Sequence, residues 1–205
     1  MLPESDDSLY GWSMSRPYRG RTSDERLVER RRRLVRSGMR LVGDGGVSAL
    51  TMRAVCRDAE LSPRFFYESF TDVEDLLREV YRETFYTMRA AIDDVADREV
   101  GTEAKVRAGV DVAARRVRDD PRICRILLIE PVADLGLRQF VREHIMEMLP
   151  TVLLPRSTGD PLRAKMRYAT VFGAMISLFL EWTEGNLGDD RAVFVDHVIA
   201  TVLRV

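Results

Sequence analysis

The chain has 205 residues and a formal net charge of −1, and its length is sufficient for one or two domains with a substantial buried core. Its first residues, Met1 to Asp7, are acidic rather than apolar, so we expect no secretion signal there. No apolar run reaches the roughly 18 residues of a membrane-spanning helix. Cys56 and Cys124 lack metal-ligand spacing, and we expect two reduced, buried thiols in a cytoplasmic protein.

Charge is unevenly distributed along the chain. Residues 16–70 hold 13 Arg and 7 Asp or Glu, a balance of +6, whereas residues 71–205 hold 19 Arg or Lys and 23 Asp or Glu, a balance of −4. A basic N-terminal third suits the binding of phosphate groups. Residues 1–22 show no periodicity and are rich in Pro, Gly, Ser and charge, which predicts a disordered arm. Its arginines could contact DNA, or the arm could be merely solvated.

The first periodic segment predicts a helix over residues 23–43. The run Arg30 to Arg33 occupies every face of that helix, so some of these side chains must be solvated, and one or two could reach a DNA backbone. The apolar face comprises Leu27, Leu34, Val35, Gly38, Leu41 and Val42.

Residues 50–70 predict two short helices separated by a tight break. Thr51 and Ser62 stand where helix N-caps are expected, and Pro63 follows Ser62 at the first helical position. A short helix, a turn of a few residues and a second short helix form the helix-turn-helix layout, whose second helix can lie in the major groove of DNA.

Between Leu34 and Leu77, five elements follow one another in order: Gly45-Gly46, Thr51-Met52-Arg53, the opening Ser62, the pair Tyr67 and Phe70, and Glu74-Asp75-Leu76-Leu77. In their order and spacing these elements resemble, without a gap, the TetR/AcrR family of bacterial transcriptional regulators. The resemblance implies a three-helix DNA-binding domain followed by a divergent helical domain that binds a ligand and forms dimers.

Three positions depart from the family pattern. The usual glycine of the turn is Glu60, which must either bear a positive φ or take another turn geometry. The usual lysine at the start of the fourth helix is Val73, which removes one expected phosphate contact. The usual polar–Gly pair that opens the recognition helix is Pro63-Arg64, and Arg64 could replace the missing charge.

The predicted DNA contacts follow from this layout and from the resemblance. Arg64 could form a bidentate contact with guanine, and Phe65 could pack on a thymine methyl group or belong to the core. Tyr67, Ser69 and Thr51 are placed for phosphate oxygens, and Glu68 should turn away from phosphate or pair with an arginine. The full predicted set is Thr51, Arg53, Ser62, Pro63, Arg64, Phe65, Tyr67 and Ser69.

The rest of the chain predicts only helices. A long fourth helix should begin at Thr71 or Asp72 and end near Asp97, and a fifth should end at Arg118. Further helices are predicted over 123–129, which Pro131 should interrupt, over about 134–149, from Asp160-Pro161 to about 184, and after Asp189-Asp190.

Methionine and aromatic residues are dense in the C-terminal region, and they suit either a helical core or the wall of an apolar cavity. The resemblance implies that some of them bind a ligand. The candidates are Phe85, Met88, Tyr168, Phe172, Met175 and Phe179. The apolar stripes of the last two long helices, which include Phe179 and Val198, predict a dimer interface.

The sequence therefore predicts an all-α protein of about nine helices, with an arm over 1–22, a helix-turn-helix domain over 23–70 and a regulatory domain over 71–205. We expect a homodimeric transcriptional repressor, released from a palindromic DNA operator by a small apolar ligand, without a cofactor or metal. One alternative is an all-α enzyme, which the sequence disfavours because it contains no acid–base or metal motif and its two histidines, His144 and His197, are far apart. The other alternative is a helical adaptor that binds acidic partners or membranes.

Overall fold

The computed structural model describes residues 23–144 and 160–204, and these residues form helices joined by turns. Counted with residues 122–133 as one helix, the described part of the chain contains nine helices and a short 3₁₀ turn, which confirms the predicted all-α fold. The predicted N-terminal arm and the predicted helix end near residue 149 lie outside the described residues. No helix of the described residues is long and apolar enough to cross a membrane.

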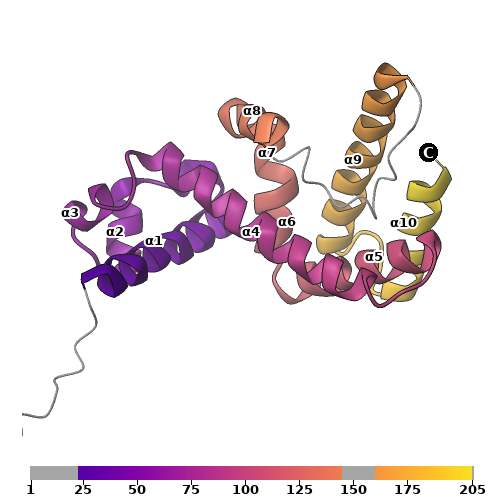
Figure 1. Cartoon of the computed structure of the whole chain (residues 1–205), viewed down its shortest axis with the longest axis horizontal. Coiled ribbons are helices and arrows are strands. Elements are labelled where there is room, and N and C mark those ends of the chain that lie inside the picture. The colour runs from indigo at the N-terminus through magenta and orange to yellow at the C-terminus, as the bar shows by residue number, and fades with distance from the viewer. Residues whose placement is uncertain (1–22, 145–159, 205) are drawn as a thin grey trace, which may run out of the picture.

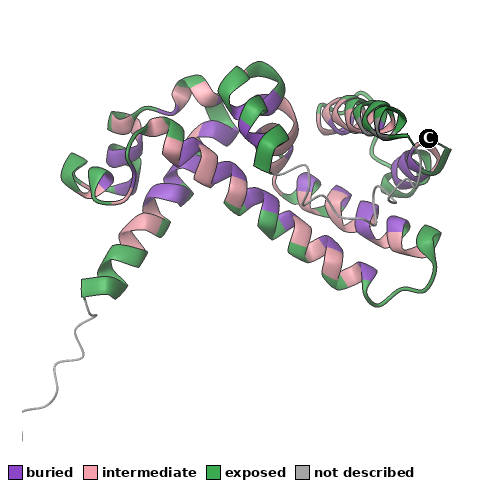
Figure 2. Ribbon diagram, turned by 45° about the horizontal axis from the view of Figure 1, so that its top comes forward, coloured by how far each residue is buried: buried purple, intermediate pink, exposed green. Residues whose placement is uncertain are grey.

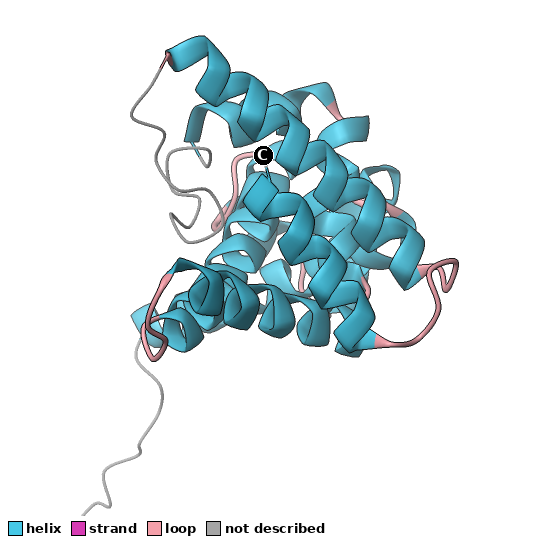
Figure 3. Ribbon diagram, turned by 90° about the vertical axis from the view of Figure 1, so that its right-hand side faces the viewer, coloured by secondary structure: helices cyan, strands magenta, loops and turns pink. Residues whose placement is uncertain are grey.

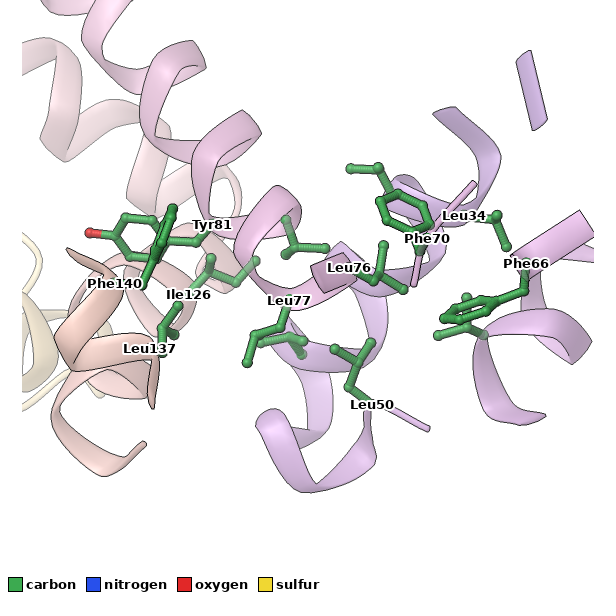
Figure 4. Packing of buried hydrophobic residues seen from close by; sticks show 14 of the residues in the cluster. Leu34, Leu50, Phe66, Phe70, Leu76, Leu77, Tyr81, Ile126, Leu137 and Phe140 are labelled. Atoms are coloured by element: carbon green, nitrogen blue, oxygen red, sulfur yellow. The ribbon is translucent and has the colours of Figure 1, made fainter. Parts of the chain in front are cut away.

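Three N-terminal helices form a unit at one end of the elongated molecule (Figure 1). They are α1 (Ser23–Gly45), α2 (Met52–Ala59) and α3 (Pro63–Tyr67), with the 3₁₀ turn η1 (Val47–Ala49) between α1 and α2. Phe66 and Phe70 insert between α1 and the first turn of the helix that begins at Val73, where they pack with Leu34 and Leu76 (Figure 4). Burial of these large side chains holds α3 in place, although it has only 5 residues.

Helix α4 (Val73–Ala96) connects the two ends of the molecule. The Asp72 side chain caps it by accepting a hydrogen bond from the Asp75 N–H at 2.7 Å. At 1.5 Å per residue, its length is about 36 Å. Its first half, up to Phe85, belongs to the hydrophobic cluster of the N-terminal unit, which also includes Ile126, Leu137, Phe140 and Val141. Its second half, from Met88, belongs to a second cluster.

The second cluster lies among α4, α5 (Thr102–Asp119), α9 (Pro161–Thr183) and α10 (Arg191–Arg204). Helix α5 returns along α4 (Figure 2), and α9 and α10 lie together across them (Figure 3). The rings of Trp182 and Phe194 stack at 4.3 Å between centroids, and Phe179 meets both rings edge-on. Phe179 and Val198, predicted to face a second subunit, are instead buried inside one chain.

Residues 122–133 run as one helix, so the predicted interruption at Pro131 is wrong. The helix consists of α6 (Arg122–Cys124), a π-helical turn η2 (Arg125–Ile129) and α7 (Glu130–Ala133). Proline has no N–H and its ring collides with the carbonyl four residues earlier in an α-helix. The wider π turn immediately before Pro131 changes that spacing, and the helix therefore continues through the proline.

The chain bends only after Ala133. Asp134 is extended, and its side chain accepts a hydrogen bond from the Leu137 N–H at 2.7 Å, which caps α8 (Leu135–His144). Arg138 of α8 donates to the Pro131 carbonyl at 3.2 Å. These bonds fix the corner between α7 and α8.

Candidate DNA-binding surface and ligand cavity

The first element of the candidate surface is the N-terminus of α2. Thr51 is extended and its hydroxyl oxygen accepts a hydrogen bond from the Ala54 N–H at 3.2 Å, which confirms it as the N-cap. Thr51 and Arg53 are both exposed, as a contact with DNA requires.

The turn between α2 and α3 keeps the geometry that normally calls for glycine. Glu60 has φ 53° and ψ 45°, in the left-handed region. The Leu61 N–H donates to the Cys56 carbonyl at 2.9 Å and the Glu60 N–H to the Arg57 carbonyl at 3.3 Å, the hydrogen-bond pattern of a Schellman motif. Of the two possibilities that the sequence left open for Glu60, the structure adopts the positive φ.

Helix α3 exposes one side and buries the other. Phe66 is fully buried, whereas Tyr67 is 63% exposed and Arg64 is also exposed. Phe65 is half-buried, because the guanidinium of Arg30 lies 4.4 Å from the centre of its ring. Its position is therefore intermediate between the core and the contact surface.

Glu68 pairs with two arginines, one on either side. It accepts from Arg64 Nε at 3.0 Å and from Arg30 Nη2 at 3.4 Å. One of the two predicted outcomes for Glu68, pairing with an arginine, is therefore observed. Arg64 forms this bond through its Nε, and 84% of the Arg64 side chain remains exposed.

The arginine run of α1 holds the helix-turn-helix together, a role that the sequence alone did not reveal. Arg31 donates to the Ser69 carbonyl at 2.6 Å and lies over the Phe70 ring. Arg33 donates to the Ala59 carbonyl at the end of α2. Arg32 is exposed and remains a candidate for the DNA backbone. Periodicity could not separate these roles, because each depends on a carbonyl more than 20 residues away.

The predicted contact residues thus lie on α2, α3 and the segments that flank them, and most are open to solvent. The exposed members are Thr51, Arg53, Ser62, Pro63, Arg64 and Tyr67, and the half-buried members are Phe65 and Ser69. The Ser69 hydroxyl donates to the Phe65 carbonyl at 3.1 Å. Contact of these residues with DNA stays a prediction.

A cavity of about 150 Å³ lies between α4, α5, α9, α10 and the 122–133 helix. Five of the six predicted ligand-binding residues line it, and the side chain of the sixth, Tyr168, lies outside the described part of the structure. The described lining comprises Tyr81, Phe85, Met88, Arg89, Ile92, Ala113, Val117, Ile123, Cys124, Leu127, Leu128, Val171, Phe172, Met175, Phe179 and Val202.

The lining is apolar apart from a few groups. Arg89 is the one charged residue of the described lining, and its Nε donates to Asp93 at 3.2 Å. Burial raises the pKa of the Cys124 thiol to about 11, so this wall carries no thiolate at neutral pH. Among the described residues, no group of three His, Cys, Asp or Glu is placed to hold a metal ion. Such a cavity suits an apolar molecule.

The sequence missed the contribution of the 122–133 helix to this wall. Ile123, Cys124, Leu127 and Leu128 all reach the cavity. The segment is short and apolar on several sides, and periodicity therefore could not distinguish a cavity wall from a core. The observed π turn, which no sequence signal predicted, determines which of its side chains face the cavity.

Comparison with known proteins agrees with this geometry. Residues 34–80 match the family model described as bacterial regulatory proteins, tetR family. No curated protein matches the sequence.

Solved structures share the fold at low sequence identity. The fatty acid degradation regulator FadR from Bacillus halodurans has a TM-score of 0.66 and 14% identity, over 85% of this chain and 94% of that chain. FadR from Bacillus subtilis, solved in complex with stearoyl-CoA, has a TM-score of 0.66 and 12% identity, over 83% and 96%. A TetR-like transcriptional regulator from Rhodococcus sp. RHA1 has a TM-score of 0.63 and 15% identity, over 85% and 94%.

Proposed function

Because this chain is a TetR-family transcription regulator with a helix-turn-helix DNA-binding domain, we propose that it is a repressor that leaves a palindromic operator when a small apolar molecule fills its cavity. The single observation that carries the proposal is the position of the 122–133 helix. It lines the cavity with Leu127 and Leu128, and Ile126 of the same helix packs into the hydrophobic cluster of the N-terminal unit.

In this proposal, α3 enters the major groove. Arg64 binds a guanine through its Nη atoms, because its Nε is already held by Glu68. Tyr67 and the residues at the start of α2, Thr51 and Arg53, bind phosphate oxygens and set the orientation of α3. Their exposure in the free chain supports these roles.

The proposed homodimer forms through the outward faces of α9 and α10. These faces expose Leu162, Met166 and Val193, each more than half accessible to solvent. Gly173 lies on the same exposed side of α9, and a Cβ built there would meet nothing within 4 Å. The absence of a side chain at Gly173 would let a helix of the second subunit approach closely. Helices α9 and α10 of both subunits would then form a four-helix bundle.

We propose a ligand with a substantial apolar part, which the lining of the cavity favours. The Bacillus subtilis FadR of similar fold was solved with stearoyl-CoA, so molecules that carry an acyl chain are a sensible first class to test. Release requires that the ligand bind unequally to the DNA-competent and DNA-incompetent states.

A reporter experiment tests the proposal. The operator, selected from random DNA with purified protein, is placed between a constitutive promoter and a reporter gene in a bacterial host. Expression of the chain should lower reporter output, and some member of a panel of acyl-chain compounds should restore it. The Arg64→Ala variant, expressed to the same level, serves as the control without repression. An increase in reporter output on expression of the chain would contradict the repressor role.

A further inference from the structure

A buried carboxylate joins the cavity wall to the DNA-binding unit. Glu130 is only 5% exposed. Its Oε2 accepts a hydrogen bond from the Val47 N–H at 2.9 Å, and its Oε1 accepts one from Arg125 Nε at 3.0 Å. A buried charge is costly unless it is paired and hydrogen-bonded, and here both carboxylate oxygens have a donor.

The backbone at Gly46 and Val47 has a conformation that lets the Glu130 carboxylate approach closely. Val47 begins η1, the turn between α1 and α2, and Gly46 before it has φ 75°. A Cβ at Gly46 would lie 3.1 Å from Glu130 Oε1, so glycine serves both the backbone conformation and the close approach of the carboxylate. The turn leads directly to buried Leu50 and to Thr51, the cap of α2.

The helix that carries Glu130 also carries part of the cavity wall. Leu127 and Leu128 line the cavity, and Leu127 packs against both hydrophobic clusters. Arg122 of the same helix packs so tightly on α1 that a Cβ at Gly43 would lie 2.4 Å from its Cβ. The π turn, a helical form often found at functional positions, lies between Cys124 and Glu130.

We propose that Glu130 is the positioning residue that transmits the state of the cavity to the operator-binding helices. This inference rests on the proposed ligand response. An occupant that displaces Leu127 and Leu128 moves the 122–133 helix. The Val47 amide follows the Glu130 carboxylate, because their separation would leave the buried carboxylate and the part-buried amide without their bond. The start of α2 then shifts relative to the position that the DNA phosphates require.

A substitution at Glu130, a matched control and a substitution that fills the cavity together isolate this link. Glu130→Gln has nearly the same shape but one oxygen and one NH₂ group. The charged guanidinium of Arg125 is the stronger of the two donors, so the oxygen should stay on Arg125 and the NH₂ group should face the Val47 N–H, which loses its bond. The matched control is Asp94→Asn, which removes the charge of an exposed carboxylate in α4 that pairs with Arg98, just after the end of that helix. Ala113→Phe acts as a built-in occupant because Ala113 lines the cavity, and Ala113→Leu replaces it if the larger side chain prevents folding.

The experiment measures operator affinity by fluorescence anisotropy for Ala113→Phe in three backgrounds: wild type, Asp94→Asn and Glu130→Gln. Circular dichroism melting confirms that each variant is folded. We expect Ala113→Phe to weaken binding about tenfold in the first two backgrounds, within the usual range of allosteric coupling, and less than about twofold with Glu130→Gln. Hydrogen exchange at the Val47 amide should be faster in Glu130→Gln than in Asp94→Asn.

Two outcomes would overturn the proposal, and they differ in what else they affect. An equal loss of affinity in all three backgrounds would show that the cavity controls DNA binding by another route, and the proposed function would stand. No loss in any background, with the filled variant folded, would remove both this proposal and the ligand response itself.

Discussion

Glu60 bears a backbone conformation that an L-residue seldom adopts. Its φ of 53° places it at the position of the Schellman turn where glycine is usual. Its ion pair with Arg33, at 3.7 Å, involves a side chain that is 87% exposed, so the pair contributes little to stability. The conformation of the turn is thus maintained by its backbone hydrogen bonds and by the packing of Leu61.

We therefore expect Glu60→Gly to leave the free energy of unfolding within about 1 kcal/mol of wild type, because relief of left-handed strain and the greater entropy of unfolded glycine oppose each other. Urea unfolding followed by circular dichroism measures the difference. A loss of several kcal/mol would mean that Glu60 makes an important contact that its exposure does not suggest.

Arg64 is the residue whose role in base recognition can be tested most directly. Arg64→Ala should lose about 1–3 kcal/mol of specific binding and relax the base preference at one position of each half-site. Tyr67→Phe is the comparison, because loss of a phosphate contact should weaken binding to specific and non-specific DNA alike. The measurement is affinity for the operator and for single-base variants of it. An equal loss on all sequences for Arg64→Ala would refute its assigned role.

At the scale of elements, local capping signals predicted helix starts well. Thr51, Asp72 and Asp160 each accept a hydrogen bond from a backbone N–H near the start of the helix that they precede. Asp190 does the same for α10. These signals depend on neighbours within a few residues, and they can therefore be read from sequence.

Properties that depend on distant residues were harder to predict. Pro131 lies within a continuous helix because of a preceding π turn, and three of the four arginines of the Arg30–Arg33 run bind distant groups of the helix-turn-helix. Phe179 and Val198 have the periodicity of buried residues, but periodicity cannot tell burial within a chain from burial between two chains. The candidate DNA-contact residues were predicted through local motifs and the resemblance, and five of the six candidate ligand residues line the cavity, whereas the part of its wall that the 122–133 helix forms required the tertiary structure.

Because Phe179 and Val198 are buried within one chain, the outward side of α9 is the better place to test the proposed dimer interface. Gly173→Arg should yield monomers, because the new side chain enters open space in one chain but would occupy the proposed contact between two. The fold should persist, since arginine favours a helix more than glycine does. Sedimentation velocity measures the mass, and Val100→Arg, at a position 93% exposed between α4 and α5, is the control. A folded Gly173→Arg dimer would place the interface elsewhere.

The molecule as a whole consists of two hydrophobic clusters joined by two helical connections. Helix α4 belongs to both clusters, and Leu127 of the 122–133 helix touches both. Charge follows the same division, because the basic balance lies in residues 16–70 and the acidic balance in residues 71–205. The basic part is therefore the expected contact surface for DNA phosphates.

This charge distribution predicts a strong dependence of DNA binding on salt. Arginine contacts with phosphate release counterions, so affinity should fall at least about tenfold between roughly 50 and 200 mM salt. Titrations of one duplex at several salt concentrations give the slope. An affinity that does not change over this range would exclude the basic N-terminal third as the main binding surface.

Selection of binding sites from random duplex DNA shows whether α2 and α3 bind DNA with sequence specificity. Purified wild-type protein should enrich one inverted repeat whose half-sites are related by two-fold symmetry. The Arg64→Ala protein, selected in parallel, should lose its preference at one position of each half-site. If the wild type enriched no sequence, the helix-turn-helix would not bind DNA specifically, and if Arg64→Ala enriched the same site with unchanged preference, Arg64 would not recognise a base.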